Sequence, residues 1–224
     1  MGKLYLVPTP IGNLGDITLR AIEVLAKVDL ILAEDTRITK KLLNHYEIKT
    51  KTKSYHIYNE HKKLNEIINL LISDNNIALV SDSGSPCISD PGYMLVREVI
   101  SKGIDLESLP GASSIIPAIT QSGFPTTNFI FEGFLPKKKG RQKKILELSK
   151  EKRTIVLFES PYRLIKLLNE IKDICGVEKN ISISREISKI FEETIRGTVD
   201  ECLLHFEEKE PKGEFVICLQ GFKS

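Results

Sequence analysis

The sequence predicts an α/β protein with two domains, the first built on a parallel doubly wound sheet and the second on a mixed sheet with flanking helices. Short apolar runs of strand length alternate with segments that carry apolar residues at helical spacing, as in βαβ units. Residues 77–80 (Ile-Ala-Leu-Val) are apolar throughout, which is typical of a strand buried on both faces. The pattern begins again after the turn-rich residues 123–128, so we expect domains at 1–122 and 123–224.

In the first domain, the segments with the composition of strands are 3–7, 30–33, 54–58, 77–80 and 104–109. The segments with helical spacing follow them, around 18–26, 38–46, 64–72, 92–102 and 115–121. Thr18 is a suitable N-cap for the first helix, whose buried face we expect to consist of Leu19, Ile22, Leu25 and Ala26. Regular alternation of strand and helix favours a parallel sheet.

In the second domain, strands are expected at 129–134, 154–158, 181–184, 191–196 and 215–219. A basic segment opens a helix that runs to about residue 150. Ser160 and Pro161 are a cap and first-turn pair for a helix over 161–174, and Thr198 is a cap for a helix through His205. Two strands in direct succession near 181–196 indicate that this sheet is mixed.

The stretch 80–92 contains the most informative loop of the chain. It follows the carboxyl end of the buried strand 77–80, which is where open α/β sheets bind ligands. Its glycines, prolines and serines allow the backbone to approach a ligand closely and to present N–H and C=O groups. An ordinary βα connection takes about 2–6 residues, and this one is roughly twice as long. We therefore interpret it as a binding loop.

Three further loops follow predicted strands, at 8–17, 34–37 and 110–114. In a parallel sheet these loops and the central one emerge at the same edge and can line one cleft. No G-x-x-x-x-G-K-[ST] motif occurs, and Gly12-Asn13-Leu14-Gly15 does not satisfy G-x-G-x-x-G. Kinase, GTPase and ordinary NAD chemistry therefore have little support.

Composition and charge argue against several further classes of protein. The four cysteines form no C-x-x-C pair and the four histidines have no ligand spacing, so neither metal catalysis nor a disulfide framework is indicated. No apolar run approaches the ~20 residues that span a bilayer, and no secretory signal is recognisable, so a cytoplasmic location is expected. The net charge is only +2, but residues 137–144 hold six cations in eight residues. This run is as consistent with a solvated helix start as with a phosphate-binding patch.

Several motifs resemble the tetrapyrrole (corrin/porphyrin) methylase superfamily, which uses S-adenosylmethionine. The resemblance is closest to the ribosomal RNA small-subunit methyltransferase I family, whose members methylate the ribose 2′-hydroxyl of a cytidine. The wider superfamily has Gly-Asp-Pro in the central loop, whereas Gly84-Ser85-Pro86 here resembles the RNA-methylating branch. The segments that carry the resemblance extend along almost the whole chain: 6–18, 33–37, 80–92, 109–114, 132–136, 158–161 and 212–214.

The resemblance implies that the methyl donor lies between the two domains. The donor contacts it implies in the first domain and at its end are Pro10, Asp82, Gly84, Ser85, Pro86, Ile88, Ser113 and Ser114. Phe158, Glu159 and Lys212 would approach the donor from the second domain. Serine hydroxyls and a helix N-terminus suit a zwitterionic amino-acid tail. The implied partners are small-subunit ribosomal RNA, in the assembled subunit, and a second copy of the chain in a homodimer.

Methyl transfer to a ribose hydroxyl is an in-line displacement, in which alignment supplies much of the catalysis and a nearby base assists. The candidate bases are Asp35, Glu34, His56 and Glu60. For Asp35, a salt bridge to Arg37 is an equally good interpretation, and Arg37 could instead hold an RNA phosphate.

The candidate RNA contacts are Lys137, Lys138, Lys139 and Arg141. Two alternatives stay open, a methylase of tetrapyrroles with the same donor site and a ribosome-binding module without catalysis.

Overall fold

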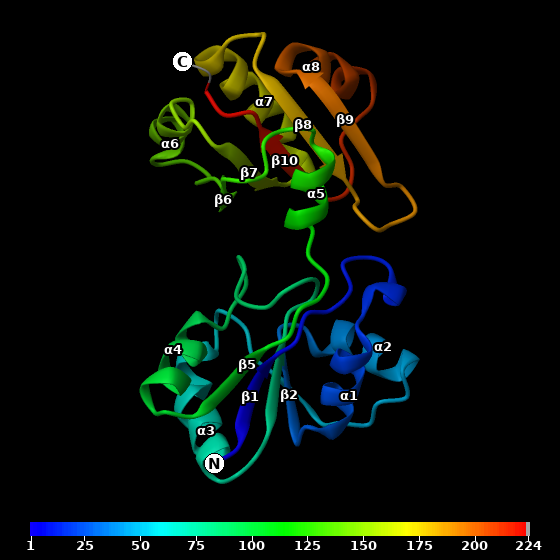
Figure 1. Cartoon of the computed structure of the whole chain (residues 1–224), viewed down its shortest axis with the longest axis vertical. Helices are drawn as coiled ribbons and strands as arrows, with labels where there is room; N and C mark the ends of the chain where they lie inside the picture. The colour runs from blue at the N-terminus through cyan, green and yellow to red at the C-terminus, as the bar shows by residue number, and fades with distance from the viewer. Residues whose placement is uncertain (223–224) are drawn as a thin grey trace. The chain divides into compact units, whose positions relative to one another are not determined.

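The computed structural model describes residues 1–222 and divides into two compact units, 1–113 and 114 onward (Figure 1). The first unit ends before α5 (Ile115–Gln121), earlier than the expected boundary after residue 122. Contacts of α5 explain the difference. The Gln121 amide donates to Ser184 Oγ at 3.2 Å, and Arg196 Nε donates to the Gln121 carbonyl at 2.7 Å. Helix α5 therefore packs with the second unit.

The first unit is built on a parallel sheet, as predicted, and its strand order is β3-β2-β4-β1-β5. The strands are β1 (Lys3–Leu6), β2 (Leu30–Ala33), β3 (Thr52–Ser54), β4 (Ile77–Val80) and β5 (Asp105–Ser108). The helices are α1 (Leu19–Lys27), α2 (Thr36–His45), α3 (Glu60–Ile72) and α4 (Tyr93–Ser101), with a short 3-10 turn, η1, at Leu14–Asp16. Figure 1 shows α1 and α2 on one face of the sheet and α3 and α4 on the other.

Strand β4 is buried on both sides, as its sequence predicts. Ile77 and Leu79 belong to the apolar core beneath α3 and α4, whereas Ala78 and Val80 belong to the core beneath α1 and α2. Alternate side chains of a strand point to opposite faces, so a strand that is covered on both faces is apolar throughout. The loop that follows β4 is consequently anchored on a rigid central strand.

Two local predictions need correction. Thr18 caps α1, accepting from the Ala21 N–H at 3.0 Å, but Leu19 is 80% exposed and Ala26 is also exposed. The buried residues are Ala21, Leu25 and Val28, which lie on one face of the helix. The prediction placed the buried face at the wrong rotation about the helix axis.

The strand expected at 54–58 lies earlier in the sequence, because the observed strand β3 ends at Ser54. Its neighbour Tyr55 is wholly buried, and the Tyr55 N–H donates to the Ala33 carbonyl at 2.7 Å. The His56 N–H then donates to Asn59 Oδ1 at 2.9 Å, which turns the chain toward α3.

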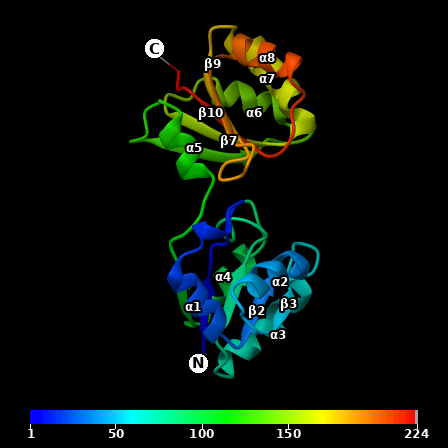
Figure 2. The ribbon, with the colours of Figure 1, turned by 90° about the vertical axis from the view of Figure 1, so that its right-hand side faces the viewer.

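The second unit contains a mixed sheet with the order β6-β7-β10-β8-β9, in which the neighbours β6 and β7 pair in parallel and the other neighbouring strands pair antiparallel. The strands are β6 (Phe129–Phe134), β7 (Thr154–Glu159), β8 (Asn180–Arg185), β9 (Glu193–Thr198) and β10 (Phe215–Leu219). The remaining helices are α6 (Arg141–Leu148), α7 (Pro161–Cys175) and α8 (Val199–Glu208). Figure 2 shows α7 and α8 on one side of this sheet and α5 on the other.

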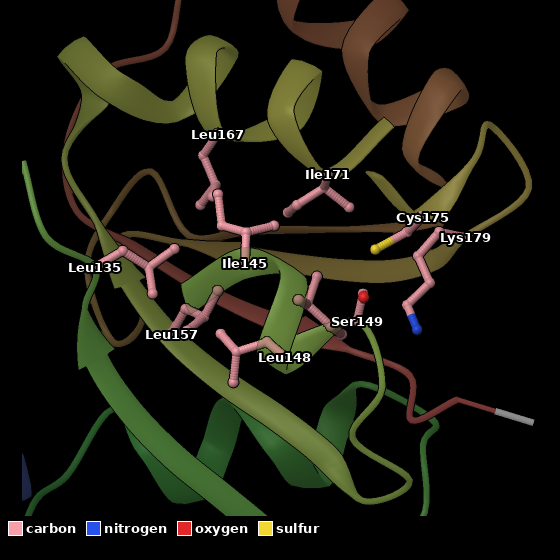
Figure 3. Close-up of a pocket in the computed structure, with 10 residues that line it drawn as sticks. Leu135, Ile145, Leu148, Ser149, Leu157, Leu167, Ile171, Cys175 and Lys179 are labelled. Carbon is pink, nitrogen blue, oxygen red and sulfur yellow. The ribbon is translucent and has the colours of Figure 1, made fainter. Parts of the chain in front are cut away.

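The core of the second unit lies between this sheet and α6, α7 and α8. Figure 3 shows Ile145 of α6 pointing toward Leu167 and Ile171 of α7. These residues and Leu148 line a cavity of about 10 Å³. A cavity of this size holds one water molecule at most, and its walls are almost entirely apolar. It is a packing defect of the core and too small for a ligand. In residues 1–222, no helix has the length and apolar character to cross a bilayer.

Candidate active site

The four loops that follow strands of the first sheet converge at one edge, as predicted. Thr9 and Gly84 form a two-residue antiparallel bridge, in which each N–H donates to the carbonyl of the other at 2.9 Å. Thr9 is buried, and its hydroxyl donates to the Ser81 carbonyl at 3.1 Å. These bonds tie loop 8–17 to the central loop 81–92.

The other two loops are held by the same central loop. The Asp35 N–H donates to Asp82 Oδ1 at 2.9 Å, which fixes loop 34–37. The Ser85 hydroxyl donates to the Ala112 carbonyl at 3.4 Å, which fixes loop 110–114. A Cβ at Gly111 would lie 2.7 Å from Pro8 Cβ, so only glycine allows this loop to rest on loop 8–17. The four loops are therefore connected to one another through residues of the first unit.

The central loop has an unusual backbone. Gly84 has φ +78° and Gly92 has φ +131°, while the non-glycine residues Cys87 and Ser89 have φ +70° and +63°. A Cβ at Gly92 would meet Cys87 Sγ at 2.6 Å and Leu79 Cδ2 at 2.7 Å. Non-glycine residues in the left-handed region cost free energy and are frequent at ligand-binding sites. The fold thus maintains a strained loop over the end of its central strand.

The predicted donor contacts in this unit can be located individually. Pro10 and Ser85 are partly exposed at the connected edge, Gly84 and Pro86 are buried within the loop, and Ile88 is exposed. Ser113 is partly buried at the end of the unit, and Ser114 is the N-cap residue of α5. An exposed apolar residue beside hydroxyls and a close backbone approach fits a nucleoside carrying an amino-acid tail.

Carboxylates gather at this edge and perturb one another. Burial, and secondarily the charge of Asp82, raises the pKa of Glu34. Burial also raises the pKa of Asp82. Asp90 is the most affected, because burial followed by the charge of Glu34 raises its pKa to about 6. A carboxyl with a pKa this close to neutrality is suited to proton transfer.

Asp35 behaves differently because it is paired with Arg37. Arg37 Nε donates to Asp35 Oδ1 at 3.0 Å and Nη2 donates to Oδ2 at 2.5 Å, while the Arg37 N–H donates to Oδ1 at 2.8 Å as the N-terminal cap of α2. These hydrogen bonds lower the pKa of Asp35 to about 2. The salt-bridge interpretation of Asp35 is therefore the one observed, and the carboxylate is a weak base.

The remaining predicted base candidates, His56 and Glu60, lie between the end of β3 and the start of α3. His56 Nε2 is 3.0 Å from Asn59 Nδ2, and His56 Nδ1 is buried with no hydrogen-bond partner among residues 1–222. Glu60 begins α3. Sequence reasoning did not single out Asp90 or Thr9. Both lie in stretches that were recognised as loops, but their roles depend on burial and on a cross-loop bridge, for which the sequence carries no signal.

In the second unit, Glu159 is a structural residue and not an exposed ligand contact. Its side chain is wholly buried, Oε2 accepts from Arg141 Nη2 at 3.3 Å, and Oε1 accepts from Arg163 Nη2 at 2.7 Å. Arg141 is only 3% exposed, and its Nε also donates to Glu170 at 2.7 Å. The expectation that Arg141 binds RNA is therefore corrected, because a buried and paired guanidinium is not available to a phosphate.

The other predicted residues of this unit are accessible. The Phe158 ring lies 5.0 Å from Phe131 and 5.5 Å from Phe134, and Phe134 is 53% exposed. Lys212 is exposed and pairs with Glu210 at 3.2 Å. Lys137, Lys138 and Lys139 are exposed before α6, and none of the three forms an ion pair within residues 1–222. They form a cationic segment of the surface, here called the lysine patch.

Comparisons with known proteins agree with this arrangement. The profile described as Tetrapyrrole (Corrin/Porphyrin) Methylases matches residues 3–203. A Thermotoga maritima protein named ribosomal RNA small subunit methyltransferase I is 50% identical over 221 residues, which cover 99% of each chain. A Synechocystis protein of the same name is 47% identical over 222 residues, which cover 99% of this chain and 80% of that protein.

A solved structure supports the fold. Uroporphyrin-III C-methyltransferase from Thermus thermophilus, complexed with S-adenosyl homocysteine, aligns with a TM-score of 0.68 over 98% of this chain and 97% of its own. The identity is 16%, so this likeness concerns the fold. The arrangement of a parallel sheet followed by a mixed sheet matches the predicted class.

Proposed function

Because this chain belongs to the tetrapyrrole (corrin/porphyrin) methylase family, and within it to the ribosomal RNA small subunit methyltransferase I group, we propose that it methylates the ribose 2′-hydroxyl of a cytidine in small-subunit ribosomal RNA. The chain is a methyltransferase that uses S-adenosylmethionine. The observation that carries the proposal is the connected edge of the first sheet, where the Thr9–Gly84 bridge and the hydrogen bonds of Asp82 and Ser85 link four loops.

When bound, S-adenosylmethionine supplies a methyl group on a sulfonium centre. In our proposal, Pro10, Gly84 and Ile88 hold the nucleoside portion, with Ser85 and Pro86 shaping the loop around it. Ser113 and Ser114 receive the amino-acid tail through their hydroxyls. The strained loop is supported by β4, so it is held in place before any ligand arrives.

The acceptor hydroxyl needs a partner for its proton. Asp90 is the best-suited carboxylate at the edge, since its pKa of about 6 makes it ionised at neutral pH and still appreciably basic. Glu34 shares this environment, and its raised pKa has the same cause. Asp35, with a pKa of about 2, is assigned instead to positioning Arg37 for contact with the RNA backbone.

The lysine patch favours RNA over a tetrapyrrole as the acceptor. Three exposed cations that have no carboxylate partner within residues 1–222 can neutralise phosphates, whereas a small-molecule acceptor has no need of them. The remaining alternative, a ribosome-binding module without catalysis, predicts that the donor does not bind. Calorimetric titration with S-adenosylmethionine distinguishes it, because heat of binding would exclude a module that has lost its donor site.

A methyl-transfer assay with labelled donor tests the proposal. The acceptors to compare are assembled small ribosomal subunits, free small-subunit RNA and a tetrapyrrole. We expect label in the RNA of the assembled subunits, at a nucleotide whose 3′ phosphodiester resists alkaline hydrolysis because its 2′-oxygen is methylated. Labelling of the tetrapyrrole alone would contradict the proposal.

The biological setting follows from the acceptor. Ribosomal RNA places the proposed reaction in the cytoplasm. We also propose that the chain acts as a homodimer, as the family resemblance implies, and light scattering of the purified protein at assay concentrations checks this directly.

A further inference from the structure

A second feature of the connected edge is a pocket of about 190 Å³ between loop 8–17 and α2. Pro10 and Leu14 form one wall, Ile38 and Leu42 of α2 form the other, and Ser81 and Asp82 lie at the end of β4. All of these residues belong to the first unit. The pocket is smaller than the roughly 300–1,000 Å³ of sites that hold drug-sized ligands, so it suits a single small ring system.

The two walls are apolar and partly open to solvent. Leu14 is 40% exposed and Ile38 is 43% exposed, so part of each apolar wall is accessible to a ligand. The Tyr46 hydroxyl donates to the Leu14 carbonyl at 2.7 Å and so ties the outer wall to the end of α2. A flat aromatic ring can insert between such walls and bury apolar surface on both of its faces.

The carboxylate of Asp82 is the polar group that can orient a ring bound in this pocket. Asp82 Oδ1 accepts from the Asp35 N–H at 2.9 Å, which fixes the orientation of the carboxylate, and Oδ2 has no hydrogen-bond partner within residues 1–222. An oriented carboxylate oxygen recognises an exocyclic amine, and Asp or Glu is the acceptor expected for the N4 amine of cytosine. Lys41, which is exposed at the rim, can donate to a ring carbonyl or to a phosphate.

We propose that this pocket receives the cytosine base of the acceptor nucleotide, unstacked from the RNA, between the side chains of Leu14 and Ile38 with its N4 amine on Asp82. This inference rests on the proposed function and specifies its substrate contact. Pro10 lines the pocket and also belongs to the proposed donor site, so a base held here keeps its ribose beside the donor.

The first test fills the pocket. Ile38→Trp places a larger ring in the space, and Ile100→Trp is the matched control because Ile100 is also an exposed isoleucine on a helix of the first unit, 62% exposed on α4. With small ribosomal subunits as acceptor, we expect Ile38→Trp to lower kcat/KM about tenfold or more and the control to keep the wild-type value. Thermal unfolding confirms that both variants are folded.

The second test determines whether the pocket distinguishes cytosine from uracil. Asp82→Asn retains an oxygen for the Asp35 N–H but directs an amide donor toward the ring. We expect about a tenfold loss of kcat/KM with the natural cytidine target, and a gain relative to wild type on subunits that carry uridine at that position. A loss that is equal for cytidine and uridine would indicate a structural role of Asp82 and overturn the assignment.

The adenine of the donor also bears an exocyclic amine, so donor affinity must be measured for each variant. Affinity for S-adenosylmethionine that is unchanged in Ile38→Trp supports the RNA base, and a parallel loss would assign the pocket to the donor instead. Failure of the proposed function is distinguishable, because it would remove activity on small subunits from the wild type and from Ile100→Trp as well. Full activity of Ile38→Trp alone would refute the pocket and leave the function intact.

Discussion

Thr9 and Gly84 exchange two backbone hydrogen bonds of 2.9 Å across the end of the first sheet. Neither residue carries a group with chemistry of its own in this bridge. Their pairing nevertheless aligns the loop after β1 with the loop after β4, which are neighbouring parallel strands. The geometry of the candidate active site therefore depends on a main-chain contact, and the most direct tests act on the backbone.

Gly84→Val should weaken donor binding, with an increase in Kd of at least about tenfold. The glycine has φ +78°, which a β-branched residue adopts only with strain, and a new side chain would occupy the approach beside Ile11 and Ala112. Calorimetric titration with S-adenosylmethionine measures the effect. Gly103→Val is the matched control, since Gly103 has φ +64° but has open space around it. Normal donor affinity in Gly84→Val would contradict the assignment of this loop.

Asp35→Asn should lower kcat about tenfold and leave donor affinity unchanged. Asparagine still caps α2, but the bidentate pairing that orients Arg37 is lost. Because the pKa of Asp35 is about 2, its titration lies outside the working range, and the pH profile of the remaining activity should keep its shape. Unchanged turnover would remove Asp35 from the active site, and a displaced pH profile would mean that Asp35 is itself the base.

Lys138→Glu combined with Lys139→Glu should weaken binding to small ribosomal subunits and reduce the dependence of that binding on salt. Both lysines are exposed in the lysine patch, and each phosphate contact contributes to the release of counterions. Filter binding at several salt concentrations, together with donor calorimetry, measures the two affinities separately. Lys49→Glu with Lys51→Glu changes the net charge equally at another exposed site and should have a smaller effect. An equal effect of the two pairs would argue against a specific patch.

Arg141→Met should destabilise the second unit by about 3 kcal/mol without reducing RNA affinity in the folded protein. The substitution leaves the buried Glu159 carboxylate with Arg163 and the Ser160 N–H as partners and removes its bond to Arg141. Urea unfolding gives the free energy of unfolding. Lys139→Met, a change at an exposed position of the same segment, is the control and should leave stability nearly unaltered. A stable Arg141→Met variant with weakened RNA binding would restore the original expectation.

Asp90 should make stability depend on pH. Its pKa is about 6 in the folded chain and 3.8 without the fold, so its contribution is fully present below about pH 4 and is lost as the pH rises through 6. Asp90→Asn cannot ionise and should therefore become more stable relative to wild type on going from pH 4.5 to 7.5. The pKa difference corresponds to about 3 kcal/mol at most, and solvent screening of a half-buried group reduces this to about 1 kcal/mol.

Urea unfolding at both pH values measures this effect, with Asp105→Asn as an exposed control on β5. Identical pH dependence in wild type and Asp90→Asn would show that Asp90 titrates normally. If Asp90 also serves as the base, the turnover of wild type should rise with pH through about 6, and the Asn variant should lose this step.

Periodicity was sufficient for most elements because each is determined by its own residues. β2, β4 and β10 begin and end where their apolar runs do, and Thr18 and Thr198 cap the helices they precede. The edge strand β3 was predicted too late in the sequence. Tyr55 has the apolar character of a strand residue, but it is buried at the turn that follows β3, where its N–H bonds to the Ala33 carbonyl. The phase of α1 was also wrong, because Leu19 lies on the solvent side despite its hydrophobicity.

What the amino-acid order determined alone is the alternation of strand and helix, and with it the edge at which the four loops emerge, since parallel strands all end on one side. Only the tertiary structure decided which polar residues serve the site and which serve the core. Arg141 and Lys139 are two cations in one basic run, yet the first is buried against Glu159 and the second is exposed. Burial and pairing depend on residues distant in the chain, so the same charge stabilises the fold at one position and is available to a ligand at the other.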